Sequence, residues 1–495
     1  MALPFNSVWA RIAADGRHRC ALWAVLALLL LPQMAEAIPL FARQTGQNCM
    51  ACHAGGQFPE LTAHGRLFKL TGYTMGERTV PLSIMGVVSN SRVANTSKSD
   101  DPASDFQRNG KTIFATGSVF LGGKITDNLG ALAQITYDPY ATQGPDGRFH
   151  GHSHADNMDV RYADRFISPS RDLIVGVSFN NNPSVSDPWN TAAAWMQYVP
   201  VPTPTSSRFI DGTTPYPSFA SGGNLAGLTA YAYWNQSLYA EFGGYATSRG
   251  PTSFMSSGVA NANTTKLRGL NPYLRLAWNR DWGAHNLMLG TSWMSARIYD
   301  NPLDTSDPSS LHRTRDWKID AQYQYLLDPH AVTAQLVFAH NRHRYPDALA
   351  NQPVAFTDVA GNPLPLTNAV DRTNLLRAKL SYVYQARYGA SIALFNLTGS
   401  TNTANQTSGY DPGTLTITSD PGAQAPSLRV GGNLSGNPAV RGMTLEAFWM
   451  PFQYMRLGAQ YTAYSRYNGA SSNYDGLGRN ARDNNSLFLY IWAAY

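Results

Sequence analysis

The sequence predicts an all-β protein: an antiparallel barrel of about sixteen strands in a bacterial outer membrane, with a small helical domain before it. Three observations support this prediction. Only 14% of the 495 residues are charged, whereas soluble domains have about 25%. Stretches of strand length alternate between apolar and polar residues. After the N-terminus, no stretch is apolar enough for a membrane-spanning helix. Such strands suit a barrel with lipid outside and water inside.

Residues 1–37 are predicted to be a cleavable signal peptide. Three arginines between positions 11 and 19 form a positive n-region, and Cys20 to Leu31 is apolar. This apolar run of about twelve residues is shorter than the roughly 20 that a spanning helix requires. The small residues of Ala35-Glu36-Ala37 then predict cleavage after Ala37.

Cleavage leaves Cys49 and Cys52 as the only cysteines of the mature chain. The run Cys49-Met50-Ala51-Cys52-His53 matches the pattern for covalent haem attachment, in which each thiol adds to a vinyl group and the histidine ligates the iron. A thioredoxin-like redox pair would need a βαβ context, and a zinc site would need a second ligand pair. We therefore predict one covalently bound haem c in a domain of residues 38–80.

Within this domain, a helix is predicted from Pro59 to Leu70, and Gly72 would end it. Two residues are candidates for the second axial ligand: His64 on the apolar face of the helix, and Met75 in the following turn. Either could instead be a packing residue, and the iron could be open or water-ligated. The apolar face comprises Leu61, His64, Leu67 and Phe68, whereas Arg66 and Lys69 lie away from it.

Residues 81–495 are predicted to form the barrel. From Trp317 to Leu327 the odd positions are mostly apolar and the even positions are polar. A soluble β-sandwich could also show one polar face, but aromatic residues here cluster at strand ends. The last strand ends in Tyr495, as in outer-membrane barrels. The strands are predicted near 84–95, 111–122, 128–138, 158–167, 171–180, 226–234, 236–247, 267–280, 285–298, 315–327, 331–344, 373–386, 388–399, 438–450, 453–466 and 485–495.

Tight turns alternate with long loops along this barrel. Asp127-Asn128 and Gly283-Ala284 are examples of tight turns, and 181–225, 344–372 and 399–437 are long loops. In outer-membrane barrels the short turns face the periplasm and the long loops face outside. Both termini are therefore expected in the periplasm, where haem is attached.

Two groups of polar residues have a predicted role in the barrel. The first lies in the third connection, a loop expected outside the cell, where His150, His152, His154 and Asp156 could bind a transition metal or simply be solvated. The second group consists of cations on interior faces, expected to line the lumen or in part to pair with haem propionates. They are Arg161, Arg275, Arg377, Lys379 and Arg456.

The N-terminal domain resembles the haem domain of the fused outer-membrane cytochrome–porins of iron-oxidising bacteria. The similar segments are Ile38–Gly46, Cys49–His53, Phe58–Leu61 and Gly65–Tyr73. This resemblance implies that the protein oxidises extracellular Fe(II) and passes the electron to a periplasmic cytochrome c or copper protein. The protein would then be a one-electron oxidoreductase, and Cys49, Cys52 and His53 would attach and ligate its haem.

A physical constraint favours an electron conduit independently. The apolar band of such a barrel is about 25 Å tall, too far for efficient electron tunnelling without a redox centre inside. The single haem domain is therefore expected to plug the lumen, which in sixteen-stranded porins is an aqueous channel. One haem carries one electron at a time, which suits Fe(II) as the donor.

Two alternatives remain open from the sequence. The conduit could serve another one-electron donor or an outward current, or the protein could be a porin with a haem-domain plug. The net charge of +6 is scattered, with no basic run, which argues against nucleic-acid binding. Outer-membrane lipid is the expected surrounding.

Overall fold

The computed structural model describes residues 39–56, 59–95, 110–143, 149–192, 224–256, 265–351, 356–357, 363–406 and 432–495. All of them belong to one compact unit that runs from Glu36 to Tyr495. The predicted signal peptide, residues 1–37, lies outside the described residues.

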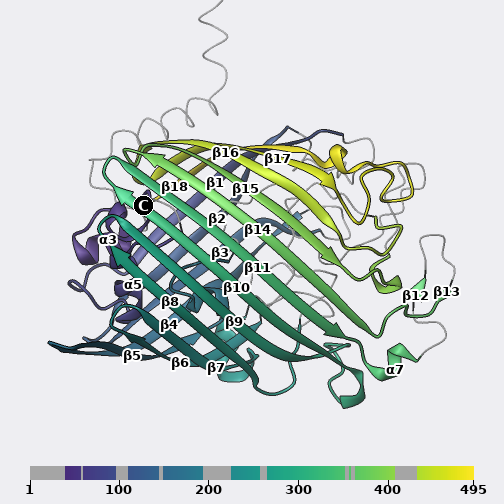
Figure 1. The fold of residues 1–495 in the computed structure, drawn as a ribbon, viewed down its shortest axis with the longest axis horizontal. Helices are drawn as coiled ribbons and strands as arrows, with labels where there is room; N and C mark the ends of the chain where they lie inside the picture. The colour runs from purple at the N-terminus through teal and green to yellow at the C-terminus, as the bar shows by residue number, and fades with distance from the viewer. Residues whose placement is uncertain are drawn as a thin grey trace, which may run out of the picture. The chain divides into compact units, whose positions relative to one another are not determined.

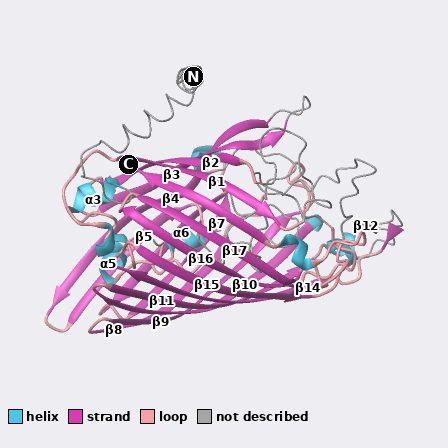
Figure 2. Cartoon of the chain, turned by 90° about the horizontal axis from the view of Figure 1, so that it is seen from above, coloured by secondary structure: helices cyan, strands magenta, loops and turns pink. Residues whose placement is uncertain are grey.

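Sixteen strands form a closed antiparallel barrel (Figures 1 and 2). The first strand, β1 (Leu82–Val93), closes it by pairing with the last, β18 (Ser486–Ala494). The other barrel strands are β2 (Thr112–Lys124), β3 (Leu129–Gln143), β4 (Phe149–Ser168), β5 (Arg171–Asn180), β6 (Leu225–Trp234), β7 (Leu238–Thr247), β8 (Asn271–Trp282), β9 (His285–Tyr299), β10 (Leu311–Leu327), β11 (His330–Arg344), β14 (Val370–Tyr384), β15 (Tyr388–Gly399), β16 (Val440–Phe452) and β17 (Met455–Arg466).

The predicted barrel and its strand number are confirmed. The largest difference lies at β3 and β4, which remain paired as far as Gln143 and Phe149. The predicted third connection is therefore largely strand. Two short strands of two residues each, β12 (Phe356–Thr357) and β13 (Pro363–Leu364), pair with each other between β11 and β14.

The described helices are short and lie mainly before β1 and in the loops. No helix among the described residues is long and apolar enough to cross a membrane. The helices are α3 (Pro39–Thr45), α4 (Cys49–Cys52), α5 (Ala63–Leu70), α6 (Pro183–Ser186) and α7 (Asp347–Ala350), with 3₁₀ turns at Gly250–Met255, Pro308–Ser310, Thr403–Asn405 and Ala481–Asn484.

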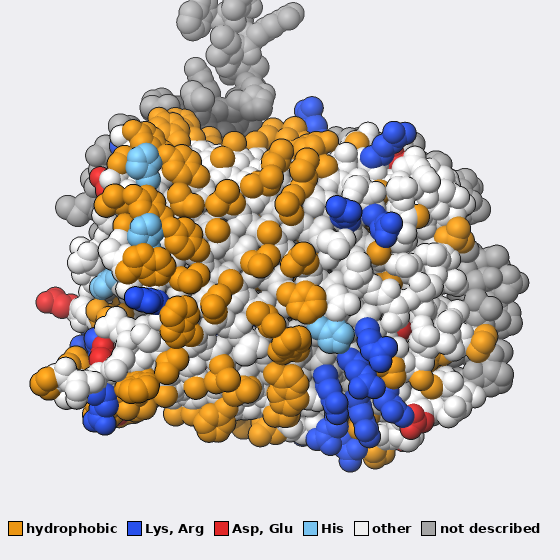
Figure 3. All heavy atoms as spheres, viewed as in Figure 1, with side chains coloured by type: hydrophobic (Ala, Val, Ile, Leu, Met, Phe, Trp, Pro, Cys, Tyr) orange, Lys and Arg blue, Asp and Glu red, His pale blue; other side chains and the backbone are white. Residues whose placement is uncertain are grey.

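Side chains alternate between the two faces of the barrel wall as the sequence predicts. On β10, Trp317 and Ile319 are exposed on the outside, whereas Asp320, Gln322 and Gln324 are buried inside. Figure 3 shows the resulting band of apolar side chains on the outer surface. An apolar outside with a polar inside is the surface that a barrel needs in a lipid bilayer.

All the tight turns lie at one end of the barrel. Several need residues in the left-handed region, such as Gly283 with φ +55° and Asn235 with φ +48°. The long connections start and finish at the opposite end, where for example β5 ends at Asn180 and β6 begins at Leu225. Helices α3 and α5 lie at the short-turn end, close to the C-terminus (Figures 1 and 2).

A charge placed in the apolar band should destabilise the barrel. We expect Ala321→Arg, on the outer face of β10 about midway between Trp317 and Leu327, to lower the free energy of unfolding by about 2–4 kcal/mol, because arginine is costly near the bilayer midplane. Urea unfolding in lipid vesicles measures this loss. The control is Leu327→Arg on the same face at the short-turn end, where the cost falls to about 0–1 kcal/mol. Equal losses in the two variants would contradict the placement of the band.

Candidate functional site

The segment before β1 folds around the two cysteines. Helix α4 begins after Asn48, whose side chain accepts a hydrogen bond from the Ala51 N–H (3.2 Å), and it ends at His53. Asn48 thereby satisfies a backbone donor that a short helix leaves unpaired. Cys49 is buried, and its thiol donates to Gln453 Oε1 (3.3 Å) in the β16–β17 turn. Cys52 is half-buried, and this burial raises the pKa of its thiol.

Helix α5 crosses directly over α4. A Cβ atom at Gly65 would lie 2.1 Å from the Cys52 carbonyl oxygen, so only glycine permits this contact. Thr62 caps α5 by accepting from the Gly65 N–H (3.1 Å) and donates to the Ala51 carbonyl. The two helices are thus held together by backbone contact around the cysteine motif.

Three aromatic rings form the core of this segment. The Phe41 ring stacks on Tyr73 at 5.5 Å and meets Phe68 edge-on at 5.0 Å. Gly72 and Tyr73 both have positive φ, which ends α5 as predicted. The predicted helix start at Pro59 is wrong, because α5 begins at Ala63.

The segment is fastened to side chains and backbone of the barrel wall. Tyr73 donates to Asp159 Oδ2 (2.6 Å) on β4, and Tyr231 on β6 donates to the Leu70 carbonyl (2.8 Å). Lys379 on β14 forms an ion pair with Glu60 (3.0 Å). These strands lie on different sides of the barrel, so the segment is held from several directions.

Two cations of α5 are buried, although the sequence pattern places them away from the apolar face. Arg66 is 1% exposed; it donates to the Leu61 carbonyl (2.8 Å) and lies 3.6 Å from Asp281. Lys69 donates to the carbonyl oxygens of Val185 (2.6 Å) and Asp187 (2.9 Å). The helix therefore buries its polar face as well, against polar groups of the barrel.

Lys69 reaches the loop that follows β5, which folds inward through α6. Trp189 of this loop is fully buried and packs in one cluster with Leu70. Asn190 donates to the Pro59 carbonyl. The helical segment and the loop thus meet inside the barrel. The sequence gives no strong signal for this inward fold of the loop.

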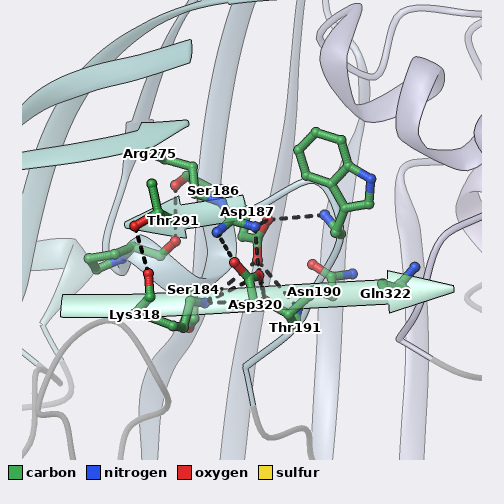
Figure 4. Close-up of polar contacts among 12 residues, drawn as sticks. Ser184, Ser186, Asp187, Asn190, Thr191, Arg275, Thr291, Lys318, Asp320 and Gln322 are labelled. Carbon is green, nitrogen blue, oxygen red and sulfur yellow. Dashed lines mark hydrogen bonds and ion pairs between the residues drawn. The ribbon is translucent and has the colours of Figure 1, made fainter. Parts of the chain in front are cut away.

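The same loop joins a network of buried charges (Figure 4). Arg275 donates to Asp320 Oδ2 (2.8 Å) and lies 3.3 Å from Asp187 Oδ1, while Lys318 lies 4.0 Å from both carboxylates. Burial alone would raise the pKa of Asp187, but the two cations hold it well below its usual range. Thr191 also donates to Asp187 (3.1 Å).

The five predicted lumen cations are accounted for by protein partners. Each has a polar contact inside the barrel, and none of the five is exposed. The partners are Asp159 for Arg161 (2.6 Å), Asp320 for Arg275, the Thr191 carbonyl for Arg377 (3.1 Å), Glu60 for Lys379 and Glu446 for Arg456 (2.9 Å).

A small cavity adjoins the cysteine motif. Its volume is about 230 Å³, and Ala51, Thr62 and His64 line it together with the β8–β9 turn. His64 Nε2 is buried and has no hydrogen-bond partner among the described residues. Met75 does not line the cavity; its carbonyl accepts from Gln44 (2.8 Å) beside α3. Of the two candidate iron ligands, His64 lines the cavity and has a side-chain atom without a hydrogen-bond partner, whereas Met75 lies away from the cavity.

The donor set fits a covalently attached haem c. Cys49 and Cys52 are unlinked thiols one helical turn apart, and His53 follows directly. The cavity itself is smaller than the roughly 300–1,000 Å³ of pockets for drug-sized ligands. A bound macrocycle would therefore require neighbouring side chains to move.

The predicted metal site at His150–Asp156 does not lie in a loop. These residues belong to β4, where Asp138 is paired with His152 and Thr136 with His154. Asp156 accepts from Thr136 (2.9 Å). The described residues contain no group of three or more His, Cys, Asp or Glu side chains arranged to hold a metal ion.

A second histidine cluster was not anticipated from the sequence. His312 Nδ1 lies 2.9 Å from His343 Nε2, and His312 Nε2 lies 2.7 Å from Asp300. Both histidines are buried inside the barrel, close to the long-loop end. The strand alternation was the available signal, because it places both positions on the inner face of the β10–β11 hairpin.

Several solved structures are similar to this chain at low sequence identity. No family model matches the sequence, and no curated protein is significantly similar to it. Salmonella typhi OmpF, solved in complex with daunomycin, is 10% identical with a TM-score of 0.43, over 84% of this chain and 97% of that chain.

Two further solved structures are similar to the same extent. Pseudomonas putida OprB is 11% identical with a TM-score of 0.41, over 87% of this chain and 96% of that chain. The anion-selective porin from Comamonas acidovorans is 11% identical with a TM-score of 0.40, over 84% and 99%. The fold assignment rests on this chain's own strand pairing, which defines a closed barrel of sixteen strands.

The buried amine of Lys69 should make docking of α5 depend on pH. Burial and the nearby Arg161 lower the pKa of Lys69 from 10.5 to about 8, although Asp159, Asp187 and Glu241 oppose this. Between pH 8 and about 9.5, below the range in which a solvent-exposed Tyr73 would ionise, the undocked segment binds more protons, so docking should become stronger as pH rises, by at most roughly 2 kcal/mol. Protease protection of the segment in the folded barrel measures this.

In Lys69→Met the pH dependence should disappear. The matched control is Lys111→Met, which replaces an exposed lysine just before β2. A wild-type segment whose protection is the same at pH 8 and pH 9.5 would show that the Lys69 amine does not titrate in this window.

Proposed function

We propose that the protein is an outer-membrane electron conduit that oxidises extracellular Fe(II) and delivers the electrons to a periplasmic carrier. The observation that supports this most is the position of the cysteine motif. The Cys49 thiol contacts Gln453 in a short turn of the barrel, and α5 of the same segment meets the β5–β6 loop inside the barrel. A motif for a redox group is thereby held at the short-turn end of a closed barrel.

The residues that would hold the group are those of the motif. Cys49 and Cys52 would form the two thioether bonds, and His53 would ligate the iron. When bound there, haem c supplies a centre that takes up and releases one electron. His64, with its unsatisfied Nε2, would be the better candidate for a second protein ligand to the iron.

The protein itself shields and positions this group. Buried contacts of Lys69 and Trp189 join the segment to the inward loop and fill part of the lumen. On the other side, Met50 within the motif is 36% exposed, and the neighbouring Gln47 and Asn48 are also exposed. This surface lies at the short-turn end and could face a periplasmic cytochrome c or copper protein.

The balance of the proposed reaction is one electron per ion. Each Fe(II) outside becomes Fe(III), and one periplasmic acceptor is reduced. A single haem motif, Cys49–His53, is present in the chain, which matches a one-electron donor. Because the motif lies at the short-turn end and tunnelling across the whole band is inefficient, Fe(II) would enter the lumen from outside to reach the haem, and the acceptor would meet the protein from the periplasm.

The first test is anaerobic addition of Fe(II) to the purified, oxidised protein in detergent. We expect reduced-haem absorption bands to grow with time, at a rate that ranks Fe(II) above other donors. Dithionite gives the fully reduced reference. A haem that dithionite reduces but Fe(II) does not, across the relevant pH range, would sink iron oxidation and leave another one-electron donor.

The porin alternative is tested by solute flux. The closed sixteen-stranded barrel is the architecture of diffusion porins. However, α5 and the β5–β6 loop occupy part of the lumen, so reconstituted vesicles should show little passage of small sugars. Fast flux through the full-length barrel would favour transport as its function.

Axial ligation gives a second prediction. His53→Ala should abolish native haem ligation, and His64→Ala should convert the oxidised spectrum from low-spin to high-spin, because an imidazole ligand is lost. Met75→Leu is the matched control and should leave the spectrum unchanged. If Met75→Leu shifts the spectrum and His64→Ala does not, the methionine is the distal ligand.

A further inference from the structure

Six arginines lie together on the outer surface of the barrel, on the adjacent strands β9, β10, β11 and β14. All six are exposed and point away from the lumen. Figure 3 shows a dense group of Lys and Arg side chains at the border of the apolar band. We call this set the arginine belt: Arg297, Arg313, Arg315, Arg342, Arg344 and Arg372.

The strand register places these cations directly opposite one another. Arg313 is paired with both Arg344 and Arg297, and Arg342 is paired with both Arg315 and Arg372. Residues opposite each other in a sheet have Cβ atoms about 4.5–5.5 Å apart, and like charges in such pairs are destabilising. The sheet therefore holds six positive charges where it costs free energy to do so.

The described residues offer little compensation for these charges. Within the belt only Arg344 has an acidic partner, Asp347 at 2.9 Å. Asp304 and Asp307 in the β9–β10 loop accept hydrogen bonds from Ser306 and Ser309 beside them. Elsewhere a surface arginine is neutralised within the protein, as Arg165 is by Asp172 at the short-turn end (2.7 Å).

The belt occupies a defined depth in the barrel wall. On the outer face of β10, Arg313 and Arg315 are followed by Trp317 and then by Ile319. On β11, the apolar stretch of the same face ends at Phe338, and His340 alone separates it from Arg342. A tryptophan between cations and an apolar band marks the boundary between headgroups and hydrocarbon. Because the long loops are at this end, the belt lies at the headgroups of the outer leaflet.

We propose that the arginine belt binds the phosphate groups of the lipid that forms this leaflet, the phosphorylated glycolipid lipopolysaccharide. A guanidinium group presents a planar fork of donors that suits phosphate oxygens. Phosphates between opposed arginines would remove the repulsion within each pair. The belt flanks the lipid-facing band, so a lipid headgroup reaches it without any change in the barrel.

This inference goes beyond the proposed electron transfer and rests only on the long loops facing outside. Failure of Fe(II) oxidation would leave it unaffected. The test uses the full-length protein in detergent and lipid A with two phosphates as the probe. Bound copies and the dissociation constant are measured by native mass spectrometry. The comparison lipids are dephosphorylated lipid A and phosphatidylglycerol, and inorganic phosphate at matched ionic strength is the competitor.

The variant is the quadruple substitution Arg313→Gln, Arg315→Gln, Arg342→Gln and Arg344→Gln. We expect at least a tenfold weaker affinity for lipid A. The matched control replaces three exposed arginines of the opposite end, none of which faces another cation in register, and should bind lipid A like the wild type. These substitutions are Arg171→Gln, Arg280→Gln and Arg387→Gln.

Thermal unfolding without lipid separates lost binding from lost folding. Because the substitutions remove like charges, the quadruple variant should be at least as heat-stable as the wild type. A less stable variant would contradict the repulsion on which the proposal depends. Equal affinity of the wild type for dephosphorylated lipid A or for phosphatidylglycerol would overturn the proposal. Displacement of lipid A by an equal concentration of inorganic phosphate would also overturn it, in favour of a free-phosphate site.

Discussion

Hydrocarbon offers no hydrogen-bond partner to a peptide group, so a sheet that crosses a bilayer must close on itself. In this protein closure depends on β1 and β18, down to the reciprocal backbone bonds between Ile84 and Tyr495 (2.7 and 2.8 Å). The other features of the structure depend on this closed sheet. It separates an outer face, where only apolar residues and headgroup cations are stable, from an inner face that can hold charge.

The inner face is stabilised by charges that satisfy one another. Arg275 and Asp320 are buried together, and removing one partner of such a pair typically costs about 3–5 kcal/mol. The wall alone does not complete this network. Asp187 comes from the β5–β6 loop, and Lys69 comes from α5 and bonds to that loop. The N-terminal segment, the loop and the wall are therefore one polar unit, although they lie far apart in the sequence.

The strands could be predicted well because lipid on one face and water on the other make apolar and polar residues alternate. This alternation identifies β10 from Trp317 to Leu327. The alternation did not reveal the strand at His150–Asp156. These residues pair in β4 but are mostly polar on both faces, so their sequence looks like that of a loop. The alternation also gave no hint that Arg66 and Lys69 are buried. A cation on a helix is normally solvated. Arg66 and Lys69 can be buried because the lumen supplies polar partners, and these partners come from segments far away in the sequence.

The burial of Cys49 sets an order of events. In the assembled protein Cys49 is 3% exposed, and its sulfur lies against Gln453 in the turn between β16 and β17, near the end of the chain. An enzyme that modifies this thiol must therefore reach it while the chain is still unfolded in transit. The segment precedes β1 in the sequence, so it is exported before the strands that later enclose it. Attachment of the proposed haem at Cys49 would therefore have to precede assembly of the barrel.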